Sequence, residues 1–144
     1  MNAYRVMKDR QQAEFNAFPI FFAFSNAQFN AAMKAWGLDP DDTNQIYCLG
    51  STGGYYRRSD APAFHEMTAR HDEEFANAIA ADKTGNGFIY DMFMYELGNH
   101  EYSYTGEINA TLDALDLTAD DFEKNPALRH GLEKACKKQR ARAA

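Results

Sequence analysis

The spacing of apolar positions along the chain predicts helices over most of its length. Residues 4–18 place apolar residues among polar side chains, which is typical of a helix with one apolar face. These apolar residues are Val6, Met7, Phe15 and Phe18. Pro19 follows this segment. Because the residue before a proline avoids the helical conformation, we expect the helix to end there.

Three apolar segments are too short for helices and are predicted to be strands. They are IFFAF at 20–24, QIYCLG at 45–50 and YYRRS at 55–59. The sequence GSTGG at 50–54 favours a turn, so we expect the second and third strands to form a hairpin. Pairing of this hairpin with the first strand would give a small antiparallel sheet.

The remaining apolar patterns predict further helices. Ser25 and Gln28 form a capping box before one helix, and a long helix is expected from about residue 60 to 81. The segment 88–99 is apolar nearly all round, as in a buried central helix. The expected fold class is α+β: a mostly helical single domain of about five to seven helices, packed with a small antiparallel sheet of about two to three strands. The other expected helices lie at 111–117, after the Thr118–Asp121 cap, and from Asn125–Pro126 onward.

Length and composition favour one globular domain over residues 1–144, with a short basic C-terminal tail at about 134–144. A chain of 144 residues with 45% apolar composition can bury a core without disulfides. Cys48 and Cys136 lie far apart and outside any CxxC motif, so we expect free thiols in a reducing cytosol. The longest apolar stretch, 17–24, is too short to cross a membrane, and the N-terminus lacks a signal-peptide pattern. We therefore expect a cytoplasmic protein with no membrane partner.

Acidic side chains are concentrated in the middle of the chain. Residues 60–123 contain 15 Asp and Glu, with only Arg70 and Lys83 as strong bases. A field of this sign opposes direct nucleic acid binding and favours a protein partner with a basic surface, although acidity can also serve solubility alone. The carboxylates expected to form the binding surface are Asp72, Glu73, Glu74, Asp113, Asp116, Asp120 and Asp121.

Two segments resemble metal sites but lack a required ligand. Residues 82–93 begin like a calcium-binding loop, but Phe93 stands where a bidentate Glu is needed. The sequence HEMTARH places His65 and His71 six residues apart, on different faces of a helix, so the two cannot share a zinc ion. His71 falls on the apolar side of its helix and is predicted to be a core histidine with one hydrogen bond.

Glu96 and His100 form the remaining candidate for a metal or catalytic site. They are four residues apart and would share a helical face, where His65 or Glu101 could complete a metal site. The Gly98–Asn99 pair indicates, however, that the helix ends near His100. Because a buried carboxylate is unfavourable unless it is paired, Glu96 must either have a partner or lie on the wet edge of its helix.

Other function classes have weaker support in the sequence. No GxSxG motif occurs, and GSTGG lacks the Lys and the following helix of a P-loop. We therefore predict no catalytic residue and no cofactor, and an enzyme is the less expected class. The alternative to an acidic binding protein is a small metal-binding protein or enzyme centred on Glu96 and His100. A third class, a regulatory or scaffold protein, would use exposed aromatic contacts: Tyr55, Tyr56, Tyr102 and Tyr104.

Several longer segments resemble a family of small, uncharacterised acidic proteins of gut bacteria, phages and conjugative elements. The segments are FFAFSNAQF, SDAPAFHEMTARH, AIAADKTGNGFIYDMFMYELGNHEYSYTG, TLDALDLT and HGLEKACK. The resemblance transfers no functional residue, but it implies a context in which mobile elements encode proteins that act on host machinery. Together with the acidic segment, it leads us to expect an accessory protein that inhibits a host nucleic-acid-binding or defence protein by mimicking nucleic acid. The oligomeric state is left open.

Overall fold

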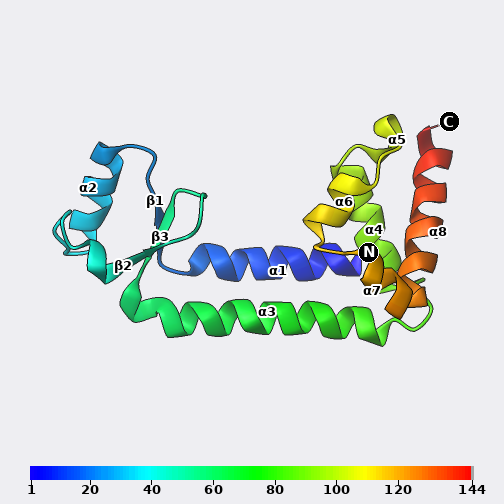
Figure 1. Cartoon of the computed structure of the whole chain (residues 1–144), viewed down its shortest axis with the longest axis horizontal. Coiled ribbons are helices and arrows are strands. Elements are labelled where there is room, and N and C mark those ends of the chain that lie inside the picture. Colours follow the sequence, from blue (N-terminus) through cyan, green and yellow to red (C-terminus); the bar gives the residue numbers. More distant parts are fainter. Residues whose placement is uncertain (144) are drawn as a thin grey trace. The chain divides into compact units, whose positions relative to one another are not determined.

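The computed structural model describes residues 1–143, which contain eight α-helices, two short 3-10 helices and one three-stranded antiparallel sheet (Figure 1). The predicted α+β fold class is confirmed. Contacts divide the described chain into two compact units. We call residues 12–72 the sheet unit, and residues 1–11 together with 73–143 the helical unit. Whether the two units act as one domain stays a prediction.

The sheet unit is organised by a central strand. Strand β3 (Gly54–Arg57) pairs antiparallel with β1 (Ile20–Phe22) on one side and with β2 (Ile46–Cys48) on the other. Tyr56 lies opposite both Ile20 and Tyr47. The predicted hairpin and its pairing with the first strand are therefore confirmed. The 3-10 helices η1 (Thr43–Gln45) and η2 (Arg58–Asp60) flank β2 and β3.

Three α-helices belong wholly or partly to the sheet unit. The unit contains α2 (Asn26–Ala35), the C-terminal part of α1 (Ala3–Ala17) and the N-terminal part of α3 (Ala61–Ala81). Ser25 caps α2, because its hydroxyl accepts the N–H of Gln28 at 3.2 Å. The predicted capping box is only half formed, since the side chain of Gln28 accepts the N–H of Phe24, at 2.8 Å, rather than that of Ser25. Tyr56, Ala61, Phe64 and Met67 form a small buried cluster in this unit, and Met33 of α2 is also fully buried.

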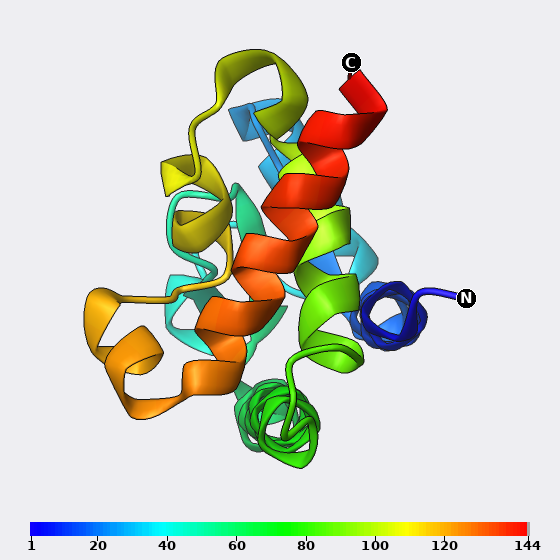
Figure 2. The same cartoon turned by 90° about the vertical axis from the view of Figure 1, so that its right-hand side faces the viewer.

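The helical unit is built around α4 (Phe88–Asn99), which packs against α8 (Pro126–Ala143), as Figure 2 shows. The predicted central helix is confirmed, since Ile89, Met92, Phe93 and Leu97 of α4 have no exposed surface. The basic residues from 134 to 142, predicted as a tail, form the last turns of α8. The other helices of the unit are α5 (Tyr102–Thr105), α6 (Asn109–Ala114) and α7 (Ala119–Lys124).

Two glycines allow close contact between the start of α4 and α8. A Cβ at Gly131 would lie 2.5 Å from Cγ2 of Ile89, and a Cβ at Gly85 would lie 2.2 Å from the carbonyl oxygen of Ala127. Gly85 also has a φ of +81°, which favours glycine. Within residues 1–143, none of the helices is both long and apolar enough to cross a membrane.

Candidate functional site

The start of α1 is fixed to α4 by Asp91. The carboxylate of Asp91 accepts the backbone N–H of Ala3 at 2.8 Å, and the side chain of Asn2 donates to the carbonyl of Asp91 at 2.8 Å. The first N–H groups of a helix have no partner within the helix, so an acid at this position stabilises α1. Asp91, an acid within this largely apolar helix, therefore has a hydrogen-bonded partner. The contact holds the first turn of α1 against α4.

Glu96 is a buried acid of the same helix. It is 2% exposed, and its Oε1 accepts a hydrogen bond from Nζ of Lys8 at 3.2 Å. Its backbone carbonyl accepts the hydroxyl of Thr111, which is itself fully buried. Oε2 has no hydrogen-bond donor within residues 1–143; the nearest charged partner is Nε2 of His100, at 3.9 Å. One carboxylate oxygen is therefore tied to a cation, and the other retains acceptor capacity.

Aromatic rings hold Lys8 in place. Its Nζ lies 5.7 Å from the ring centroid of Tyr4 and 5.1 Å from that of Tyr95, within the range of cation–π attraction. Burial, and after it the charge of Glu96, raise the pKa of Tyr4 above its ordinary value. Tyr4 therefore stays a neutral hydroxyl group next to the Lys8–Glu96 ion pair.

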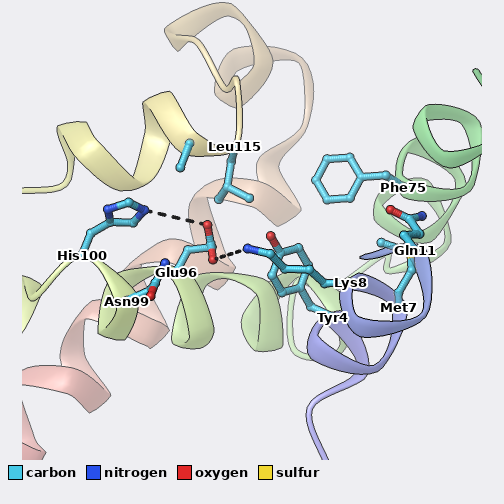
Figure 3. Close-up of a pocket in the computed structure, with 10 residues that line it drawn as sticks. Tyr4, Met7, Lys8, Gln11, Phe75, Glu96, Asn99, His100 and Leu115 are labelled. Atoms are coloured by element: carbon cyan, nitrogen blue, oxygen red, sulfur yellow. Dashed lines mark hydrogen bonds and ion pairs between the residues drawn. The ribbon is translucent and has the colours of Figure 1, made fainter. Parts of the chain in front are cut away.

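Tyr4, Lys8, Glu96 and His100 line a pocket of about 470 Å³ in the helical unit. Figure 3 shows Lys8 and His100 reaching Glu96 from opposite sides. The volume falls within the roughly 300–1,000 Å³ of small-molecule sites, and the combination of apolar walls with a few polar groups is typical of them. The apolar walls are formed by Met7 of α1, Phe75 of α3, and Ala114 and Leu115 at the end of α6. Gln11 of α1 and Asn99 of α4 add further polar groups.

The structure brings together only two of the four residues that were predicted as a possible metal site. Glu96 and His100 do approach each other on α4, as the sequence predicted. Glu101 is exposed and follows the helix with a left-handed φ of 57°, whereas His65 lies exposed on α3 in the sheet unit. Among the described residues, no group of three His, Cys, Asp or Glu side chains is placed to hold a metal ion.

The predicted acidic residues differ in their local partners. Glu74 accepts hydrogen bonds from Arg10 at 2.8 Å and from Gln11 at 2.7 Å. Asp120 pairs with Lys124 at 2.8 Å, and both are exposed.

Asp121 forms the predicted capping box, because its carboxylate accepts the N–H of Thr118 at 2.8 Å. Glu73, Asp113 and Asp116 are exposed on the helical unit, whereas Asp72 is exposed on the sheet unit. A common surface for all seven stays a prediction.

The loop that begins like a calcium site is held in its conformation by hydrogen bonds to Asp82, its first residue. The carboxylate of Asp82 accepts the backbone N–H groups of Gly85, Gly87 and Ile89, each at 3.0 Å. Partial burial raises the pKa of Asp82, but these hydrogen bonds outweigh it and hold the pKa below its ordinary value. Asp82 therefore organises the turn into α4.

Two of the tyrosines predicted as contacts belong to the interior. Tyr56 and Tyr102 are buried, Tyr55 is partly buried and stacks on Phe21, and only Tyr104 among the four is largely exposed, at 90%.

Sequence reasoning missed Tyr4 and Lys8. They lie more than 85 residues before Glu96 in the chain. The unfavourable burial of Glu96 signalled that a partner was needed, but nothing in the local sequence identified it.

Comparison with known proteins gives one match. Residues 3–138 match the model of a family described as a family of unknown function, DUF7659. Neither the curated proteins nor the solved structures yielded a match. The predicted resemblance to an uncharacterised family is confirmed.

Proposed function

The chain belongs to this family of unknown function, and we propose that it binds a small molecule in the Glu96 pocket. The observation that supports the proposal most is the buried Glu96 carboxylate, which accepts a hydrogen bond from Lys8 through one oxygen and belongs to a residue that lines a pocket. Polar groups that converge in a partly apolar pocket are the usual mark of a ligand site.

The charges of the pocket suggest the chemistry of its ligand. Glu96 supplies a hydrogen-bond acceptor, and Lys8 has three N–H donors, of which one is directed at Oε1. A molecule with an ammonium and a carboxylate group could pair with both. Its apolar part would contact Met7, Phe75 and Leu115. We therefore propose α-amino acids or similar small zwitterions as the ligand class.

Calorimetric titration with the amino acids, led by L-leucine and L-phenylalanine, tests this proposal. We expect Glu96→Gln to weaken binding by about tenfold or more, since hydrogen bonds to charged groups contribute roughly 1.5–3 kcal/mol. Glu101→Gln is the matched control, because Glu101 is exposed and does not line the pocket. Isoamylamine and 4-methylpentanoic acid, which each lack one charge of leucine, should bind more weakly than leucine.

A second variant is needed because Glu96→Gln could lose binding through loss of structure rather than loss of a ligand contact. Ala114 is exposed and lines the pocket, so Ala114→Trp would fill the space while it leaves the Lys8–Glu96 pair intact. Loss of binding in Ala114→Trp, with an unchanged melting temperature, is the expected result. Undiminished binding in both variants would show that the ligand sits elsewhere, and no binding of any amino acid would remove the proposal.

A second candidate function is the binding of a protein with a basic surface, as the sequence predicted. It is favoured by one observation on the helical unit: residues 107–123 contain six Asp and Glu and no Lys or Arg, and five of the six are exposed. Complementary charge would make such binding fast and sensitive to salt. That the partner is a host nucleic-acid-binding or defence protein, bound by nucleic acid mimicry, stays a prediction.

A further inference from the structure

An apolar groove of about 290 Å³ lies between α6, α7 and α8 of the helical unit. Figure 2 shows α6 and α7 along one side of α8. Ile108, Leu112 and Leu132 line the groove and are only partly buried, and Phe122 lies among them at 9% exposed. The groove therefore leaves aliphatic side chains open to an additional contact.

The edges of this groove are acidic. Glu123 of α7 and Glu133 of α8 line it and are exposed, with Arg129 as the cation among the lining residues. Among the walls of the groove, α6 carries Asp113 and no basic residue. Helix α7 carries Asp120, Asp121 and Glu123 against one base, Lys124, which pairs with Asp120 at 2.8 Å. An apolar strip with carboxylates at its edges complements a helix that has one apolar face and basic flanks.

We infer that this groove, which we call the α6–α8 groove, binds a basic amphipathic helical segment of a protein partner. The inference rests on the second candidate function and adds the surface that would carry it. Apolar side chains of the segment, three or four residues apart, contact Leu112, Phe122 and Leu132. Its lysine or arginine side chains face Glu123 and Glu133.

Fluorescence anisotropy with a model peptide tests the inference. The probe is a labelled 14-residue peptide of leucine and lysine with one apolar helical face, and the control peptide has the same composition in an order without such a face. Ala119 is exposed and lines the groove, so Ala119→Trp would block it without loss of a buried contact. We expect this variant to weaken binding of the amphipathic peptide at least tenfold.

Two double variants, which remove the same number of charges, distinguish binding in the groove from general electrostatic attraction. Glu123→Gln with Glu133→Gln removes two charges from the groove, whereas Glu101→Gln with Glu107→Gln removes two exposed charges that do not line it. We expect the first pair to weaken binding at least fivefold more than the second.

The possible outcomes distinguish the groove from the broader function. If both peptides bind equally, and both pairs of variants weaken them to the same extent, the protein attracts basic chains but the α6–α8 groove is not the site. If neither peptide binds at 50 mM salt, the basic-partner function itself is wrong. If Ala119→Trp retains full binding, the groove inference is overturned.

Discussion

Glu96 shows how a single buried carboxylate can be tolerated and still keep one oxygen available as an acceptor. Its burial would be strongly unfavourable without a cation, and Lys8 supplies one at 3.2 Å. Lys8 is itself oriented by two tyrosine rings and remains 42% exposed. The pair therefore joins a fixed buried acceptor to a cation that solvent can reach. This is the arrangement that a small charged ligand would use.

Glu14 carries the clearest pH-dependent contribution to stability. Hydrogen bonds from Arg70, and after them from His71, lower the pKa of Glu14 to about 2 from an ordinary 4.5. Since the pKa is lower in the folded state, the contribution is complete above pH 4.5 and is lost as pH falls toward 2.

We therefore expect Glu14→Gln to be less stable than the wild type near pH 7. The difference in the free energy of unfolding should narrow between about pH 5 and pH 2. Urea denaturation over this range measures it, with Glu73→Gln, an exposed acid on the same helix that Arg70 belongs to, as the control. If the difference in the free energy of unfolding between the wild type and Glu14→Gln were the same at pH 2 as at pH 7, the role of the Glu14 contacts would be contradicted.

At the scale of elements, much of the structure was predictable because it depends on local patterns. The 88–99 helix, the Ser25 cap and the Thr118–Asp121 capping box all depend on residues within a few positions of one another. The hairpin follows from glycine-rich turn chemistry between two short apolar strands. The 3-10 helices were missed, because segments of three residues have no periodicity to read.

The packing of α4 on α8 gives a prediction for a glycine. In Gly131→Ala the new methyl group would lie 2.5 Å from Cγ2 of Ile89 and 2.8 Å from the carbonyl oxygen of Gly85. Overpacking of this kind costs about 1–3 kcal/mol, which exceeds the gain of up to about 1 kcal/mol from alanine in a helix. Thermal or urea denaturation should show a clear net loss of stability.

Gly98→Ala is the matched control for this substitution. Gly98 is also helical, but the nearest atom to its added Cβ would be Nε2 of Gln139, at an ordinary 3.6 Å. We expect Gly98→Ala to be neutral or slightly stabilising. Equal effects of the two substitutions would show that the contact at Gly131 is not tight.

At the scale of the whole molecule, the sequence was a poor guide to the site. Lys8 and Phe75 line the pocket with Glu96 only because α1 and α3 contribute to the helical unit from distant parts of the chain. The charge of the middle of the chain was evident, but its distribution was not. Asp121 caps a helix, Glu74 binds Arg10, and Asp72 belongs to the sheet unit. Counting acids cannot separate structural carboxylates from those available to a partner.

The most direct test of the Glu96 pocket is NMR of protein labelled with ¹³C at the methionine methyl groups. Met7 lines the pocket, whereas Met33 is fully buried in the sheet unit and serves as the internal control. On titration with L-leucine or L-phenylalanine, the Met7 signal should shift and saturate, Met33 should stay in place, and Glu96→Gln should abolish the shift. A Met7 signal that no amino acid moves, or that moves equally in Glu96→Gln, would contradict the account.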